Sequence, residues 1–238
     1  MFERWWPSVL VVVLVAAWCT GCDFPRDSEG TLERVRGGTM RVGLAINEPW
    51  TRMEEDRASG VEVTLVSMFA DELRAEPVFV QGTVPELLEA IKENELDVVI
   101  GGLTEDSPGA REQTEAALTR AYLTTRPIVG VPPSQVPFDD LSGRKVGVER
   151  IDRTAAELRK RGAIPVQTED LSAAKGPIAA YPWQIEEWGF KKTGIELPEE
   201  QHVMAVPLGE NGWLVRLERF LHAHRDEAER LLRKEAAR

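Results

Sequence analysis

Residues 95–104 have the sequence ELDVVIGGLT, and this stretch decides the fold of the chain. Three consecutive apolar residues, Val98, Val99 and Ile100, are followed by Gly101 and Gly102. A short apolar run without alternation is typical of a strand that is buried on both faces of a parallel sheet, and glycines are typical of the turn that ends such a strand. The stretch therefore predicts a central parallel strand.

The residues before this strand predict further elements of the same sheet. Residues 40–44 and 77–80 favour strands, and residues 61–75 and 85–93 place apolar side chains at helical spacing. Alternation of strand and helix indicates a parallel sheet with helices packed on it. We therefore expect the α/β fold class.

The residues after Tyr122 predict a second unit with the same alternation. Its expected strands cover residues 127–131, 145–148, 164–166 and 177–180, and its expected helices cover residues 154–161, with Thr154 as a cap, and 182–189. A strand over residues 202–206 and one long C-terminal helix follow, with Leu214, Leu217, Leu221, Ala228 and Leu231 on one face of that helix. Two α/β units of similar order are therefore expected.

The N-terminus predicts export and attachment to a membrane. Residues 5–18 are almost all apolar, a length that suits the core of a signal peptide better than a membrane span. They end in Cys19-Thr20-Gly21-Cys22, which resembles the bacterial lipobox with Cys22 as the lipidated residue. We expect residues 1–22 to form a lipoprotein signal peptide ending at lipidated Cys22, and the polar residues 23–38 to form a flexible tether. An uncleaved N-terminal anchor is the alternative, and it would also hold the protein at a membrane.

The composition argues against several classes of function. The formal net charge of -11 repels the phosphates of nucleic acids, so no nucleic-acid partner is expected. The only two cysteines are Cys19 and Cys22, which leaves the exported part without a thiolate metal site. Because the three histidines are scattered along the chain, we expect neither a metal ion nor a cofactor.

Four segments together resemble the family 3 extracellular solute-binding proteins. They are residues 40–44 (MRVGL) with Glu48-Pro49-Trp50, residues 95–104 (ELDVVIGGLT), residues 118–122 (LTRAY) and residues 139–148 (DDLSGRKVGV). The resemblance implies the type II periplasmic-binding-protein fold, in which two α/β lobes with mixed, mostly parallel sheets are joined by a two-strand hinge. It implies a first lobe of residues 39–125 plus 204–238 and a second lobe of residues 126–203, with crossings near residues 124–128 and 201–204.

The resemblance implies ligand contacts in the loop that follows residue 100. Thr104 matches a hydroxyl or main-chain contact of the family, and Ser107 is placed to donate its hydroxyl to the same ligand group. Arg111 matches the arginine that grips the ligand carboxylate in amino-acid-binding members, a task that suits a guanidinium fork. The alternatives are a turn residue for Thr104, a helix cap for Ser107 and a solvated loop position for Arg111. Arg120 is the alternative candidate for the arginine that grips the carboxylate.

Further ligand contacts are implied on both sides of the cleft. Trp50 matches a family aromatic that stacks on the ligand, or else it packs at the lobe surface. Asp152 and Thr154 stand at the start of a helix where family members bind anions, and a plain cap is the alternative for Thr154. Tyr181 stands where amino-acid binders carry an aspartate for the ligand ammonium. A carboxylate such as Glu186 or Asp152 therefore substitutes, or the ligand is not an ordinary amino acid.

The function implied by the resemblance is solute capture without enzymatic activity. We expect a monomeric lipoprotein on the periplasmic face of the inner membrane, or on the cell surface of a bacterium. Its lobes would close by hinge motion on a small polar solute, an amino acid or a related carboxylate, for an inner-membrane ABC permease. Two alternatives stay open: a sensor or accessory lipoprotein with the same fold and no transport role, and a dehydratase-like enzyme, which would need an acid/base pair facing the cleft.

Overall fold

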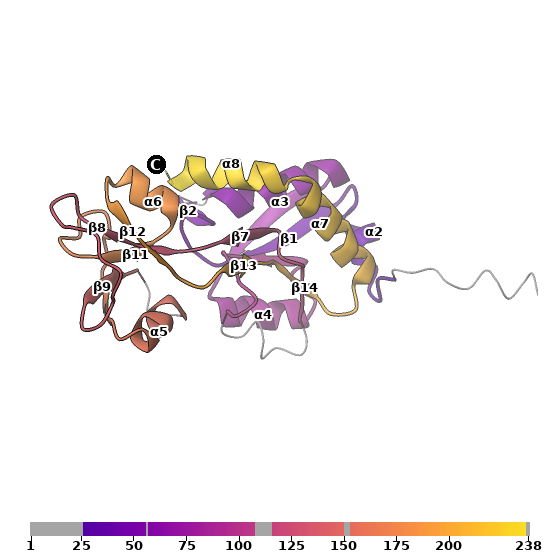
Figure 1. Ribbon diagram of the computed structural model, residues 1–238. Helices are drawn as coiled ribbons and strands as arrows, with labels where there is room; N and C mark the ends of the chain where they lie inside the picture. The colour runs from indigo at the N-terminus through magenta and orange to yellow at the C-terminus, as the bar shows by residue number, and fades with distance from the viewer. Residues whose placement is uncertain (1–25, 56, 108–115, 150–152, 237–238) are drawn as a thin grey trace, which may run out of the picture.

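The protein has two lobes joined by a pair of crossing strands (Figure 1). The structure is a computed structural model that describes residues 26–55, 57–107, 116–149 and 153–236. Lobe 1 contains both ends of the described chain, and lobe 2 contains its middle (Figure 1). The described residues include no helix that is both long enough and apolar enough to cross a lipid bilayer.

The sheet of lobe 1 is mixed, with the strand order β4-β1-β5-β14-β6. Its strands are β1 (Thr39–Leu44), β4 (Glu76–Gln81), β5 (Val98–Ile100), β6 (Ala116–Leu118) and β14 (Ala205–Pro207). Strand β1 pairs in parallel with β4 and β5, whereas β14 pairs antiparallel with β5 and β6. The strand predicted at residues 98–100 is therefore confirmed, and it lies at the centre of this sheet.

Helices cover both faces of the lobe 1 sheet. They are α2 (Thr31–Val35), α3 (Val61–Leu73), α4 (Val84–Lys92), α7 (Asn211–Ala223) and α8 (Arg225–Ala236). Successive side chains of β5 point to opposite faces because a strand has a period of two. Val98 and Ile100 join the core with residues of α3, α7 and α8, while Val99 joins a smaller core with Leu87, Leu88 and Ile91 of α4.

Lobe 2 repeats this arrangement, with the strand order β10-β9-β11-β8-β12. Its elements are β8 (Ile128–Val131), β9 (Lys145–Val148), α5 (Arg153–Lys160), β10 (Ile164–Gln167), β11 (Ile178–Ala180), α6 (Pro182–Glu187) and β12 (Lys191–Glu196). Leu158 of α5 and Ile185 of α6 are fully buried in separate hydrophobic clusters. Each sheet thus has two parallel and two antiparallel pairings.

The two lobes are connected by β7 (Leu123–Thr125) and β13 (Glu200–His202). These strands pair antiparallel, with Thr124 opposite Gln201, so the chain crosses twice in the regions expected from the sequence. A small hairpin of β2 (Arg52–Glu54) and β3 (Arg57–Ser59) was not predicted. The two-strand hinge and the mixed α/β lobes are confirmed.

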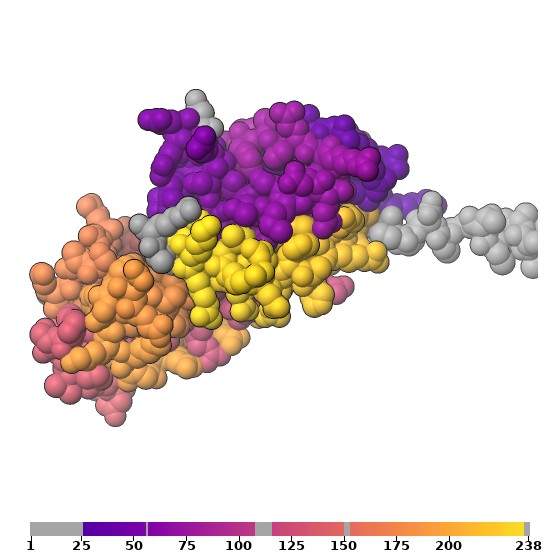
Figure 2. All heavy atoms as spheres, turned by 90° about the horizontal axis from the view of Figure 1, so that it is seen from above, coloured from indigo at the N-terminus to yellow at the C-terminus, as the bar shows by residue number. Residues whose placement is uncertain are grey.

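The prediction of one long C-terminal helix is wrong, because the helix ends at Ala223 and α8 begins at Arg225. His224 between them has a φ of -107° and stacks its ring on Phe220 at 4.1 Å between centroids. The change of direction lets α8 lie along lobe 1 and reach lobe 2 (Figures 1 and 2). Leu217 and Ala228 are nevertheless buried in the same hydrophobic core, as their spacing predicted.

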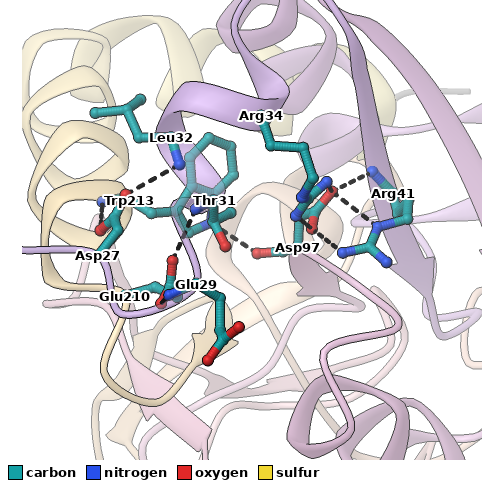
Figure 3. Close-up of polar contacts among 9 residues, drawn as sticks. All are labelled: Asp27, Glu29, Thr31, Leu32, Arg34, Arg41, Asp97, Glu210 and Trp213. Carbon is teal, nitrogen blue, oxygen red and sulfur yellow. Dashed lines mark hydrogen bonds and ion pairs between the residues drawn. The ribbon is translucent and has the colours of Figure 1, made fainter.

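The prediction of a flexible tether over residues 23–38 is wrong for residues 26–38. Helix α2 lies in this stretch, and Val35 at its end is fully buried. Glu210 accepts hydrogen bonds from the amides of Glu29 and Thr31 at 2.7 and 2.8 Å, and Asp27 accepts one from the amide of Trp213 at 2.8 Å (Figure 3). These contacts attach the segment to the start of α7. Residues 23–25 lie outside the described residues.

Candidate ligand-binding site

A cavity of about 590 Å³ lies between the lobes, and both lobes and the hinge contribute to its lining. The polar and aromatic side chains among its lining residues are those of Asn47, Trp50, Thr104, Asp106, Ser107, Glu149, Arg153, Thr154, Tyr181, Gln184, Glu200 and His202. A cavity of this size suits a small molecule, and its many polar groups suit a polar one.

The floor of the cavity on lobe 1 is built from Asn47, Trp50 and Gly102. Trp50 is only 2% exposed and stacks on His202 of β13 with ring centroids 4.0 Å apart. Gly102 has a φ of +62°, and a Cβ atom there would lie 2.4 Å from Cδ1 of Trp50 and 2.5 Å from Nδ2 of Asn47. Only glycine fits this position, because both the backbone angle and the close approach exclude a side chain.

The buried carboxylate of Glu62 supports this floor from inside lobe 1. One oxygen accepts hydrogen bonds from the amides of Gly101 and Gly102 at 2.6 and 2.8 Å, and the other accepts one from the hydroxyl of Tyr122 at 2.6 Å. Burial raises the pKa of Glu62, and the three hydrogen bonds oppose that rise. Glu62 therefore fixes the turn on which the cavity rests.

The turn after β5 carries the two hydroxyls that the sequence singled out. The hydroxyl of Ser107 accepts a hydrogen bond from the amide of Thr104 at 2.8 Å, and the two hydroxyl oxygens are 3.2 Å apart. Both residues line the cavity, so a place in the turn does not exclude a ligand contact for Thr104, and that contact stays a prediction. An isolated bridge between Thr104 and His202 joins this turn to the hinge.

His202 brings an uncharged ring to the cavity. Burial lowers the pKa of His202 to about 3, against a smaller opposing effect of the backbone at Gly102. The ring is therefore neutral at pH 7. Its Nε2 lies 2.8 Å from the hydroxyl of Thr125 on the neighbouring hinge strand.

Lobe 2 contributes residues from α5 and from the end of β11. Thr154 is the second residue of α5 rather than its cap, and its hydroxyl donates to Glu200 at 3.3 Å. Tyr181 donates from its hydroxyl to the other oxygen of Glu200 at 2.5 Å and stacks on Trp183 at 4.6 Å. Arg153, the first residue of α5, forms an ion pair with Asp106 of lobe 1. These contacts tie lobe 2 to the hinge and to lobe 1.

The structure brings five of the seven predicted ligand-binding residues together. Trp50, Thr104, Ser107, Thr154 and Tyr181 all line the one cavity, and ligand binding by them stays a prediction. The other two, Arg111 and Asp152, lie outside the described residues, as does Cys22.

Sequence reasoning missed several residues of the cavity. Asp106, Glu200 and His202 were not predicted as site residues, although His202 lies in the expected second crossing and Glu200 directly precedes it. Polar residues in a segment that crosses between lobes were the signal that could have found Glu200 and His202. Glu186, considered as a substitute carboxylate, is not among the lining residues and pairs with Lys192 at 2.5 Å on the surface. Among the described residues, no group of three or more side chains is arranged to hold a metal ion.

The hinge, the paired lobes and the cavity between them define a two-lobed binding protein. The family model of the bacterial extracellular solute-binding proteins, family 3, matches residues 40–229. The chain therefore belongs to this family, and the resemblance noted in its sequence is confirmed. No curated protein sequence matches the chain.

Several solved structures share the fold at low sequence identity. The L-cystine solute receptor of Neisseria gonorrhoeae, in its unliganded open conformation, has a TM-score of 0.67 at 14% identity over 87% of this chain and 97% of the receptor. An ancestral cationic amino acid solute-binding protein has a TM-score of 0.65 at 19% identity over 86% and 98%. The GluR0 ligand-binding core in complex with L-glutamate has a TM-score of 0.64 at 17% identity over 82% and 98%. Likeness at these identities shows the type II periplasmic-binding fold alone.

Proposed function

We propose that this protein captures a small polar solute, an amino acid or a related carboxylate, between its two lobes and delivers it to an inner-membrane ABC permease. The proposal includes a lipid anchor at Cys22, a monomeric state and a location on the periplasmic face of the inner membrane. The observation that carries it is the cavity of about 590 Å³, which both lobes and the hinge line with polar groups.

The similar proteins support an amino acid as the solute. One is an L-cystine receptor, one is a ligand-binding core with L-glutamate, and others are arginine-binding proteins. One further structure is the substrate-binding domain of an amino acid ABC transporter, described as putative. Family members are binding proteins, so we propose that no bond of the solute is broken.

A ligand screen on the full-length lipoprotein in detergent tests this proposal. Thermal unfolding is followed with amino acids, dicarboxylates and polyamines, and hits are examined by small-angle scattering. Ligand at 100 times its Kd stabilises the protein by about 2.7 kcal/mol, and the radius of gyration decreases as the lobes close. A chain that shows neither response with any compound is an accessory or sensor lipoprotein rather than a solute carrier.

The carboxylate clamp is proposed to be Arg111, from the family resemblance. Arg111→Ala is then expected to abolish the thermal shift given by an amino acid while sparing that of the corresponding amine without a carboxylate. Arg159→Ala removes an exposed arginine of α5 and serves as the matched control. Equal shifts in both variants would remove Arg111 from the site.

A further inference from the structure

The described part of the cavity lining has an excess of negative charge. It contains three carboxylates, Asp106, Glu149 and Glu200, and one guanidinium, Arg153. The only histidine in the lining, His202, adds no positive charge at pH 7 because burial lowers its pKa to about 3. A cleft lined mainly by one sign of charge attracts ligands of the opposite sign, and closure strengthens that attraction by excluding water.

Glu200 is the carboxylate that the fold holds in place from three sides. It lies on hinge strand β13, where its backbone pairs with Thr125 of β7. Tyr181 at the end of β11 and Thr154 of α5 donate hydroxyl hydrogen bonds to its two oxygens, at 2.5 and 3.3 Å. Because one donor binds each oxygen, the plane of the carboxylate is fixed before any ligand arrives.

The other acidic side chains near the cleft are placed differently. Asp106 forms an ion pair with Arg153, and Glu149 is exposed whereas Glu200 is half-buried. Partial burial makes a charge at Glu200 more effective, since less solvent screens it. An aromatic ring also adjoins the carboxylate, because Tyr181 lines the cavity and stacks on Trp183 at an interplanar angle of 13°. A ring beside a carboxylate suits a positively charged nitrogen.

We propose that Glu200 binds a positively charged nitrogen of the ligand, with Tyr181 and Thr154 as positioning residues. The cleft then selects an ammonium or guanidinium compound, such as a basic amino acid or a diamine, over a dicarboxylate. This inference rests on the proposed function of the cavity as the solute site. In this proposal a residue of the hinge, rather than residues at the strand ends of either lobe, determines which ligand charge the cleft prefers.

Calorimetry on the full-length lipoprotein in detergent tests this assignment with L-arginine, putrescine and L-glutamate as probes. We expect L-arginine to bind about tenfold or more tightly than L-glutamate. Glu200→Gln keeps the size of the side chain and removes its charge, so it should weaken L-arginine binding by about tenfold or more. Tyr181→Phe removes one donor to Glu200 and should weaken L-arginine binding less, without changing the order of the probes.

The control is Glu199→Gln, which removes the same charge one residue away. Glu199 is exposed, pairs with Arg126 and is not among the cavity-lining residues, so L-arginine binding should stay within about twofold of the wild type. Equal effects of Glu199→Gln and Glu200→Gln, or tighter binding of L-glutamate, overturn the assignment of Glu200 while the solute site stands. A wild-type protein that binds none of the three probes, and does not close with any compound of the wider screen, overturns the solute site as well.

Discussion

Arg153 of lobe 2 forms an ion pair with Asp106 of lobe 1, and this pair joins the two lobes across the candidate cleft. The side chains of Arg153 and Asp106 are 50% and 27% exposed, so water screens the pair. Such pairs contribute about 0.2–1 kcal/mol. A contribution of that size changes the ratio of closed to open protein by at most about fivefold. The pair therefore biases the lobes toward closure without locking them.

Replacing Asp106 should open the ligand-free protein. Asp106→Asn removes the charge that Arg153 of the other lobe contacts, so the radius of gyration from small-angle scattering should increase. High salt should have the same effect on the wild type, because salt screens exposed pairs. Glu227→Gln breaks an exposed pair with Arg230 within α8 and should leave the radius unchanged. A radius that neither the Asp106 variant nor salt alters would mean that the pair does not control closure.

Glu62 should be essential for the floor of the cleft. Glu62→Ala leaves the amides of Gly101 and Gly102 and the hydroxyl of Tyr122 without their buried acceptor. Each unsatisfied buried group costs about 1–3 kcal/mol, so the free energy of unfolding should fall by about 3 kcal/mol or more. Denaturant unfolding at pH 7 measures the loss. A loss below about 1 kcal/mol would show that water replaces the carboxylate.

The pH dependence of stability should reveal the raised pKa of Glu62. Since its pKa is higher in the folded protein than in the unfolded chain, the folded state holds the proton more tightly. Stability from this group is therefore lost as pH rises from about 4.3 through the folded pKa. The unfolding free energies of wild type and Glu62→Gln are measured from pH 4 to pH 8. As pH rises, the wild type should lose stability relative to the variant. A difference that is constant with pH would contradict the raised pKa.

The parts of the fold that the sequence predicted are those with a repeated apolar pattern. Val98–Ile100 is buried on both faces, and α4 turns Leu87, Leu88 and Ile91 inward at helical spacing, so both elements could be read from local sequence. Helix α2 has five residues and buries only Thr31 and Val35. A pattern needs several turns to be visible, and this helix depends on contacts with Glu210, which is 179 residues from Thr31 along the chain. Local sequence could not predict it.

The candidate site also contains residues that the sequence could predict and residues that it could not. Thr104 and Ser107 follow a recognisable strand, so their place at the cleft could be predicted from the order of the elements. Glu200 lies in a three-residue hinge strand, and its contact with Tyr181 depends on how lobe 2 meets the hinge. That contact is tertiary. The sequence showed that Tyr181 stands where an aspartate was expected. It did not show that the hydroxyl of Tyr181 contacts the carboxylate of Glu200.

Asp97 of the stretch that decides the fold should contribute to stability through two arginines. Burial tends to raise the pKa of Asp97, but hydrogen bonds from Arg41 and Arg34 outweigh it and lower the pKa. The distances are 2.6 Å from Nη2 of Arg41 and 2.5 Å from Nη2 of Arg34 (Figure 3). Because the folded pKa is lowered, this stability is present above about pH 3.9 and is lost as pH falls through the folded value.

Asp97→Asn should therefore destabilise the protein in a pH-dependent manner. The loss at pH 7 should be about 2–3 kcal/mol, below the usual cost for a broken buried pair because both arginines are partly exposed. The difference from the wild type should shrink between pH 4 and pH 2. Glu95→Gln removes an exposed carboxylate two residues away and is the control. A loss that is the same at both pH values would show that Asp97 acts through packing alone.

The segment before β1 should be protected from proteases because Glu210 holds it. Ser28, Glu29 and Thr31 donate hydrogen bonds of 2.9, 2.7 and 2.8 Å to the Glu210 carboxylate, and an amide cannot accept all three since its nitrogen is a donor. Glu210→Gln should therefore release α2 and speed trypsin cleavage after Arg34 and Arg36, as followed by mass spectrometry.

The exposed Glu229 of α8 provides the control for this experiment, since Glu229→Gln removes the same charge without touching the segment. Burial tends to raise the pKa of Glu210, but the donated hydrogen bonds lower it, so the attachment of the segment, followed by amide hydrogen exchange, should also weaken as pH falls below about 4.3. Equal cleavage of wild type, Glu210→Gln and Glu229→Gln at a rapid rate would mean that residues 26–38 behave as a tether after all. Slow cleavage of the wild type and the Glu229 variant, with rapid cleavage of the Glu210 variant, is the outcome that the hydrogen bonds require.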